Sequence, residues 1–254
     1  MGAFAFHRYT GVGAVTLPAT LVQVGFRAFH ASSVTMLDLS ACAKLESVDE
    51  WAFRGCTGLR LATLGGCSRL RRLGPFTFQG CTGPTHLKLP PRLLQLNAKA
   101  FQGCASLPQV ALPRSLESID DQAFEGCTQL QRVDLSRCVA LATIHAFAFA
   151  RCTALASLDL SGCHALVSIA RSALRGCEAL RLVRLPLHFD LGALELPPTC
   201  LLEVGPGPGP GPGPGPGPGP GPGPLYGRAA HWAGALRNLA MPPGRSNPSR
   251  GTVQ

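Results

Sequence analysis

A short motif returns along most of this chain at nearly constant spacing, and it constrains the fold more than any other feature. Its full form is Ala-Phe-x-Gly-Cys, as in the segment from Ala52 to Cys56. The anchor residue, which is Phe in all copies but one, stands at positions 6, 29, 53, 78, 101, 124, 149 and 174. The intervals are therefore 23 to 25 residues. A fixed period of this length is the signature of a repeat protein whose units stack along one axis.

A second pattern follows each anchor. Apolar residues recur six, nine and eleven positions later, as in Leu130, Val133 and Leu135. The last step has the period of two that places alternate strand residues on one face, so each unit predicts one short strand whose inward side chains enter a core. The 25-residue form continues Leu-Ser-x-Cys after the strand, whereas the 23-residue form has Leu-Pro. We interpret this difference as an insertion in a turn.

These residues resemble a known family. Leu-x-x-Val-x-Leu-x-x-Cys is similar to the cysteine-containing leucine-rich repeat, and Leu-Pro-x-x-Leu-x-x-Ile-x-x-x-Ala-Phe-x-Gly-Cys resembles its BspA-like branch. The resemblance covers residues 3 to about 204. It implies an α/β-type repeat solenoid: a leucine-rich repeat arc with a parallel β-sheet on the concave face and short helical or irregular return segments. It also implies a protein-binding or adhesive role. The Phe anchors are expected to stack as a column on the side opposite the strands.

The chain divides by composition into three parts. Residues 3–204 form the predicted solenoid, with about seven repeats and degenerate ends. Near its end, Leu191–Pro197 repeats the strand motif and predicts a closing coil that ends at Val204. Residues 205–224 are ten Gly-Pro pairs, which exclude helix and sheet because Pro fixes φ and lacks the backbone N–H. Residues 225–254 contain four Arg and no acidic residue, and they predict a disordered basic tail.

Eleven cysteines fall mostly into two columns, one after the anchor and one after the strand. They are expected to be buried free thiols, because Cys acts as a small hydrophobe in a tight turn. No Cys-x-x-Cys or His-x-x-x-His spacing supports a zinc site, so no metal and no cofactor is predicted. The start lacks the features of a secretory signal, which predicts a cytoplasmic location; the alternative is the cell surface, with an incomplete N-terminus.

Enzymatic and nucleic-acid chemistry find little support. No Gly-x-Gly-x-x-Gly, Walker, nucleophile-elbow or zinc-protease motif occurs, and the prediction is that the chain is not an enzyme. The net charge of +9 invites a nucleic-acid hypothesis. Because the arginines are scattered and interleaved with acidic residues, this partner is not favoured. No apolar run reaches the length of a membrane span.

The strand residues eight and ten positions after each anchor point away from the core. They form a ribbon of mixed charge that predicts a protein-binding face. Its candidate contact residues are His86, Lys88, Gln109, Arg132, Asp134, Ser157, Asp159, Leu182 and Arg184. The predicted function is a non-catalytic protein-binding scaffold. The alternatives are a cell-surface adhesion protein and the substrate-recognition part of a larger enzyme such as a ubiquitin ligase.

Overall fold

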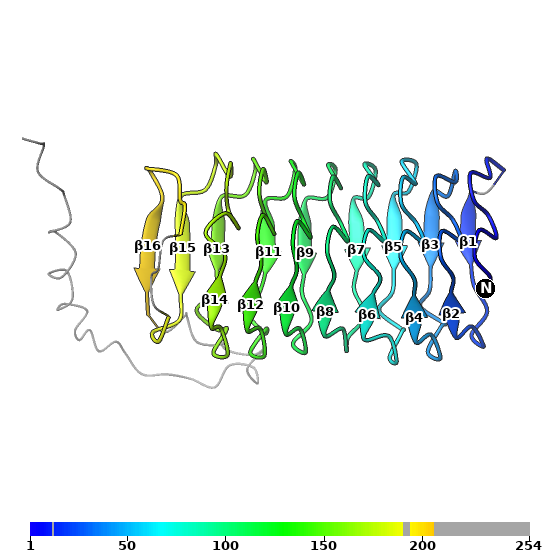
Figure 1. Ribbon diagram of the computed structural model, residues 1–254, viewed down its shortest axis with the longest axis horizontal. Coiled ribbons are helices and arrows are strands. Elements are labelled where there is room, and N and C mark those ends of the chain that lie inside the picture. The colour runs from blue at the N-terminus through cyan, green and yellow to red at the C-terminus, as the bar shows by residue number, and fades with distance from the viewer. Residues whose placement is uncertain (12, 190–193, 206–254) are drawn as a thin grey trace, which may run out of the picture. The chain divides into compact units, whose positions relative to one another are not determined.

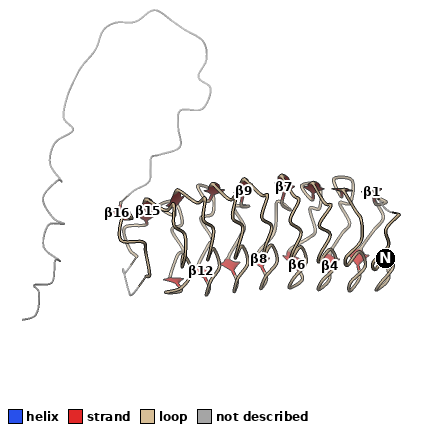
Figure 2. Cartoon of the chain, turned by 90° about the horizontal axis from the view of Figure 1, so that it is seen from above, coloured by secondary structure: helices blue, strands red, loops and turns tan. Residues whose placement is uncertain are grey.

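The computed structural model describes residues 1–11, 13–189 and 194–205. The chain winds into a solenoid in which most coils contribute two short strands, one to each of two rows (Figures 1 and 2). Neighbouring strands in both rows are parallel. The predicted linker and tail lie outside the described residues, apart from Gly205.

The first row, called the first sheet, holds the strands predicted from the apolar pattern. Hydrogen bonds join its members in three groups. The first group is β1, β3, β5 and β7, the second is β9 and β11, and the third is β13, β15 and β16. The strands of this row are β1 (Ala14–Thr16), β3 (Met36–Asp38), β5 (Leu61–Thr63), β7 (His86–Lys88), β9 (Gln109–Ala111), β11 (Arg132–Asp134), β13 (Ser157–Asp159), β15 (Leu182–Leu185) and β16 (Leu201–Val204).

The second row, called the second sheet, was not predicted. Its seven strands form one uninterrupted ladder. They are β2 (Gln23–Val24), β4 (Ser47–Val48), β6 (Arg72–Leu73), β8 (Gln95–Leu96), β10 (Ser118–Ile119), β12 (Thr143–Ile144) and β14 (Ser168–Ile169). The second residue of each strand is Val, Leu or Ile and packs on or within the core, whereas the first residue faces outward. Each coil therefore closes around apolar side chains from both sheets.

The return segments take the irregular form rather than the helical one, the second of the two forms that the resemblance implied, since no described residue lies in a helix. The return segment is a tight turn. In most coils it contains two residues in the left-handed conformation, one of them two positions before the anchor and the other two positions after it. Around Phe101 these are Lys99, with φ of 57°, and Gly103, with φ of 72°. Such residues cannot continue a right-handed helix. The Gly of the repeated motif therefore supplies a backbone conformation that other residues adopt at a cost.

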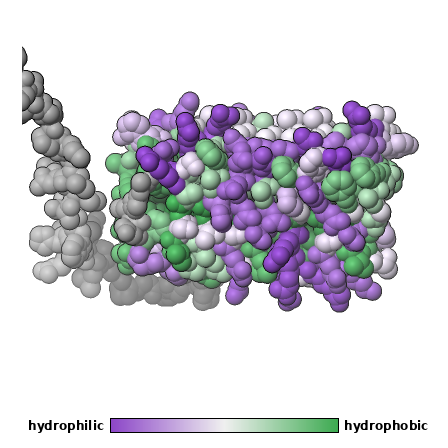
Figure 3. All heavy atoms as spheres, in the orientation of Figure 1, coloured by the Kyte–Doolittle hydropathy of each residue, from purple (hydrophilic) through white to green (hydrophobic). Residues whose placement is uncertain are grey.

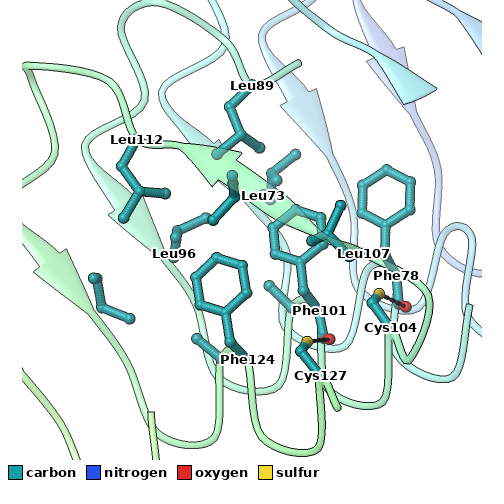
Figure 4. Close-up of a cluster of buried hydrophobic side chains, with 14 of the residues drawn as sticks. Leu73, Phe78, Leu89, Leu96, Phe101, Cys104, Leu107, Leu112, Phe124 and Cys127 are labelled. Carbon is teal, nitrogen blue, oxygen red and sulfur yellow. Dashed lines mark hydrogen bonds between the residues drawn. The ribbon is translucent and has the colours of Figure 1, made fainter. Parts of the chain in front are cut away.

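The anchors form the predicted column. From Phe6 to Phe149, neighbouring rings are stacked with centroids 5.0–5.4 Å apart and planes within 10° of parallel. Figure 4 shows Phe78, Phe101 and Phe124 side by side, with leucines from the second sheet and from the segments that flank β7 and β9 packed against them. A coil that could not bury a phenyl ring alone buries it between two equivalent rings.

The motif cysteines are buried beside this column, as predicted. The thiol of each donates a hydrogen bond to the backbone carbonyl of the anchor one coil earlier, for example Cys127 to Phe101 at 3.2 Å (Figure 4). The same contact recurs from Cys56 to Cys177 at 3.0–3.5 Å. Cysteine fits this position because it is small enough for the turn and carries a second donor for a carbonyl that already accepts one backbone N–H, as the Phe101 carbonyl does from Cys104 at 3.1 Å.

The closing coil was expected to contain a strand in Leu191–Pro197, of which residues 191–193 lie outside the described residues. In the described part of the expected segment, residues 194–197, there is no strand. The closing strand is instead β16, which pairs in parallel with β15 so that Arg184 is opposite Glu203. Figure 3 shows hydrophobic surface toward both ends of the solenoid and a mostly hydrophilic stretch between them. The exposed apolar residues at these ends include Phe4, Tyr9 and Leu201.

Candidate functional site

All nine predicted contact residues lie on the outer side of the first sheet, one or two to a strand from β7 to β15. Six are exposed and three are partly exposed. The structure divides them into two groups. His86, Lys88, Gln109, Arg132 and Asp134 line a hollow of about 450 Å³ over β5 to β11. Ser157, Asp159, Leu182 and Arg184 lie beyond it, on β13 and β15.

The hollow lies where the first sheet is interrupted between β7 and β9. In intact parts of this sheet, the residue seven positions after the anchor donates its backbone N–H to the equivalent residue one coil earlier, as Thr85 does to Arg60 at 2.9 Å. In the coil that contains β9, the residue seven positions after the anchor is Pro108, which has no N–H. The hydrogen bond to the Thr85 carbonyl is therefore missing, and Leu87 of β7 is only partly buried.

The charges in the hollow are not neutralised by neighbours. Within the described part of the chain, Lys88 and Arg132 make no ion pair. Among the residues whose positions are described, His86 makes one side-chain hydrogen bond, between its Nδ1 and the Thr85 hydroxyl at 3.0 Å. Charged groups without partners on a rigid sheet are available to a ligand at little cost in conformational entropy.

Asp134 has a structural role that the sequence analysis did not foresee. Its Oδ1 accepts hydrogen bonds from the backbone N–H of Ser136 at 3.1 Å and from the Ser136 hydroxyl at 2.7 Å. Asp159 and Ser161 repeat this arrangement, at 3.0 Å for the N–H. The expectation that outward residues are free of structural demands is therefore wrong for these two aspartates, which shape the turn after their strands.

In a third coil, Asp38 binds the N–H of Ser40 at 2.9 Å. Hydrogen bonding by Ser40 lowers the pKa of the Asp38 carboxyl. The Asp-Leu-Ser sequence is thus a recurrent turn element of the solenoid.

The second group is joined by ion pairs. Arg184 lies 3.5 Å from Asp159 on the preceding strand and donates to Glu203 on β16 at 2.8 Å. The hydrogen bond to Glu203 raises the pKa of the Arg184 guanidinium. Sequence reasoning missed Glu203 because its position depends on the register of β16, which the repeat pattern did not give. Because these charged groups pair with one another, they are less available to a ligand than the unpaired charged groups of the hollow.

The buried thiols are poor nucleophiles. Burial raises the pKa of Cys127 to about 12 and that of Cys177 to about 11, so both remain protonated at neutral pH. Over the residues with described positions, no group of three or more His, Cys, Asp or Glu side chains could hold a metal ion. None of these residues lies in a helix long and apolar enough to cross a bilayer.

The architecture is that of a parallel β-solenoid built from leucine-rich repeats. The BspA type leucine-rich repeat region matches residues 1–69 and 71–190 in six copies. The chain therefore belongs to the BspA-type leucine-rich repeat family. No curated protein is significantly similar to it.

Two solved structures resemble the chain. The leucine-rich repeat protein of T. pallidum is 24% identical, with a TM-score of 0.54 over 61% of this chain and 70% of that one. A leucine-rich repeat protein from Bacteroides ovatus is 17% identical, with a TM-score of 0.43 over 80% of this chain and 78% of that one. The first of these likenesses supports the fold and carries no functional detail.

Proposed function

We propose that the chain is a non-catalytic scaffold that binds an extended segment of a protein partner across the first sheet, at the hollow over β7 to β11. The observation that carries this proposal is the break between β7 and β9, which opens a hollow edged by Lys88, Gln109 and Arg132. The family to which the chain belongs consists of repeat scaffolds, which fits a binding role rather than a catalytic one.

The shape of the hollow favours a protein segment over a small molecule. It is open, and it is floored by the strand residues Leu87 and Val110 rather than enclosed on all sides. Small-molecule sites bury most of their ligand, whereas a shallow hollow on a rigid sheet accepts a few side chains of a larger surface. Lys88 and Arg132 without ion pairs, beside a single carboxylate at Asp134, favour a segment that carries negative charge.

The experiment is site-specific photo-cross-linking in the full chain. A photoreactive amino acid at Ala111, in the hollow, is expected to give a covalent adduct with the partner, whereas one at Ser168, on the second sheet, is not. Cross-linked material is identified by mass spectrometry. The combined change Lys88→Glu and Arg132→Glu should reduce the adduct at least tenfold, since it reverses both unpaired cations.

The matched control is Arg72→Glu, a charge reversal at an exposed strand residue of the second sheet. It should leave the adduct unchanged. If Arg72→Glu removes the adduct and the double variant does not, the binding face is the second sheet and the proposal is wrong. Asp134 and Asp159 are left intact, because their loss would disturb the turns. The cytoplasmic location expected from the sequence stays a prediction.

A further inference from the structure

A second group of side chains, remote from the first sheet, lies on the turns around the first anchors of the solenoid. We call Arg27, His30, Trp51 and Arg54 the cation–aromatic cluster. Arg27 and Trp51 occupy the same repeat position, two before the anchor, in neighbouring coils. His30 and Arg54 share the position just after the anchor. Stacking of the coils therefore brings the four side chains together, and all four are partly exposed.

The Trp51 ring holds both arginines. The guanidinium carbon of Arg27 lies 3.9 Å from the ring centroid, and that of Arg54 lies 5.0 Å from it. Arg27 is also 5.0 Å from the centroid of Phe26. A guanidinium held against aromatic rings loses little further freedom when it binds a planar oxyanion, because its hydrogen-bonding edge is already oriented. The cluster is thus preorganised for a carboxylate or a similar group.

Hydrogen-bond donors outnumber acceptors in this cluster. Arg27 Nε, Trp51 Nε1 and His30 Nδ1 are buried atoms without a hydrogen-bond partner among the described residues. Arg54 uses the two acceptors nearby, Gln79 Oε1 at 2.6 Å and His30 Nε2 at 3.3 Å. Within the same part of the chain, no carboxylate lies within ion-pair distance of either arginine. What the cluster lacks is a negatively charged oxygen acceptor.

A hollow of about 530 Å³ adjoins the cluster and is lined in part by His30 and Arg54. Its other side is formed by the glycines that follow the anchors, Gly55, Gly80 and Gly103. Each has a φ near +70°, the conformation that the turn requires. The turn therefore creates a strip without side chains beside the oriented guanidinium group of Arg54. A backbone with an acidic side chain can approach along this strip.

We propose that the cation–aromatic cluster binds carboxylate side chains of a short acidic segment of a protein, whose backbone lies in the adjoining hollow. This site is separate from the one proposed on the first sheet and does not depend on it. Arg27 and Arg54 hold the carboxylates, and the glycine strip accommodates the chain.

Two observations favour a short acidic peptide over a nucleic acid. The Trp51 ring already contacts both arginines and Phe76, whose centroid is 5.7 Å away, so little of it is left for a base to stack on. The column that begins with His30 and Arg54 also continues through Gln79 and Gln102 to Glu125, joined by side-chain hydrogen bonds. A longer polyanion that followed this column would therefore meet the carboxylate of Glu125.

The test uses the full chain with Trp232→Phe, which leaves Trp51 as the only tryptophan. The probe is a blocked tetraglutamate peptide, and the emission of Trp51 is followed during titration at low salt. A saturable change is expected with tetraglutamate and none with tetraglutamine. Arg27→Gln and Arg54→Gln should each weaken binding at least tenfold. Arg92→Gln, which removes an exposed arginine elsewhere on the solenoid, should leave it unchanged.

Arg27→Lys separates binding from folding, because it keeps the charge but not the planar group. It should retain the thermal midpoint of the parent and bind several-fold more weakly. The proposal is overturned if tetraglutamate gives no saturable change, if Arg92→Gln weakens binding as much as Arg27→Gln, or if Arg27→Lys binds like the parent. Tighter binding of a four-nucleotide thymidine oligomer than of tetraglutamate would also overturn it, and would assign the cluster to nucleic acid.

Discussion

The two sides of the solenoid follow different rules. The second sheet and the Phe turns, together called the uniform side, repeat the same residue types in nearly every coil, and their ladder is uninterrupted. The first sheet, called the variable side, has longer strands yet is interrupted twice, and its outward residues differ from coil to coil. Continuity of a sheet is thus not set by strand length in this solenoid. The uniform side holds the coils in register, which leaves the variable side free to differ.

The largest test of this comparison removes one ring from the uniform side. Phe101→Ala leaves a cavity between the Phe78 and Phe124 rings and should lower the free energy of unfolding by about 3–5 kcal/mol. Val110→Ala, in the same coil but on the variable side, removes only two methyl groups and should cost clearly less. Urea denaturation followed by circular dichroism measures both. Equal losses would show that the two sides contribute alike.

A second test interrupts the second sheet as Pro108 interrupts the first. Glu117 donates its N–H to the Leu94 carbonyl at 2.7 Å. Glu117→Pro removes this donor and should destabilise the protein by about 2 kcal/mol or more. Glu117→Gln keeps the N–H, is exposed, and serves as the control. A Pro variant as stable as the Gln variant would mean that the second sheet is not needed for register.

The buried thiols of the uniform side should make stability depend on alkaline pH. Burial raises the pKa of Cys127 to about 12, whereas in the unfolded chain a thiol has a pKa of about 8.5. The contribution of the protonated thiol to the free energy of unfolding is fully present at pH values below the pKa of the thiol in the unfolded chain. It is lost as the pH rises from there through the folded value, because only the unfolded state releases the proton.

Each such thiol contributes a fall of about 1.4 kcal/mol per pH unit in this window. Unfolding by urea at pH 8, 9.5 and 10.5 under reducing conditions measures the slope. Cys127→Ser keeps a donor for the Phe101 carbonyl but does not titrate. Its free energy of unfolding should therefore fall less steeply with pH than that of the parent, by the amount that one thiol contributes. An identical slope in both proteins would show that Cys127 does not stay protonated in the folded state.

The smallest expected effect is a gain. Pro108→Gln introduces the residue type found at the equivalent position 131 and restores an N–H opposite the Thr85 carbonyl. It should stabilise the protein by about 0.5–1.5 kcal/mol, the usual net value of one such hydrogen bond. Hydrogen exchange of the residue 108 amide would report the new bond. The Pro108→Gln change should also narrow the hollow and weaken cross-linking at Ala111. If hydrogen exchange and cross-linking are both unchanged, Pro108 is not the cause of the break between β7 and β9.

The repeat period was enough to predict the coil, the column of Phe rings and the burial of the cysteines, because all three follow from equivalent residues stacking on one another. It did not predict the second sheet, since a strand of two residues such as Ser118–Ile119 has no detectable alternation. The choice between a helical and an irregular return segment could not be made from the sequence, because the left-handed residues at positions such as Lys99 give no signal in residue type.

The candidate site was only partly accessible to sequence reasoning. The outward residues were found, but their environment was not, because it depends on which groups meet across coils. Pro108 was visible as a residue without an N–H, yet its effect required the hydrogen-bond register of the first sheet. The pairing of Arg27 with Trp51 could have been found by reading down the repeat column two residues before the anchor, where an Arg and a Trp stand in successive coils.

The matched register of equivalent positions, such as Ile119 opposite Ile144, has an evolutionary consequence. Because each coil contacts mainly its neighbours, a duplication of one 23- or 25-residue unit adds a strand to each sheet, a ring to the column and a thiol to its ladder without changing any other contact. Unequal recombination within such a gene can therefore lengthen or shorten the protein and still yield a folded product. Selection can then change the number of coils, and with it the breadth of the outward face, without changing the stability of the remaining coils.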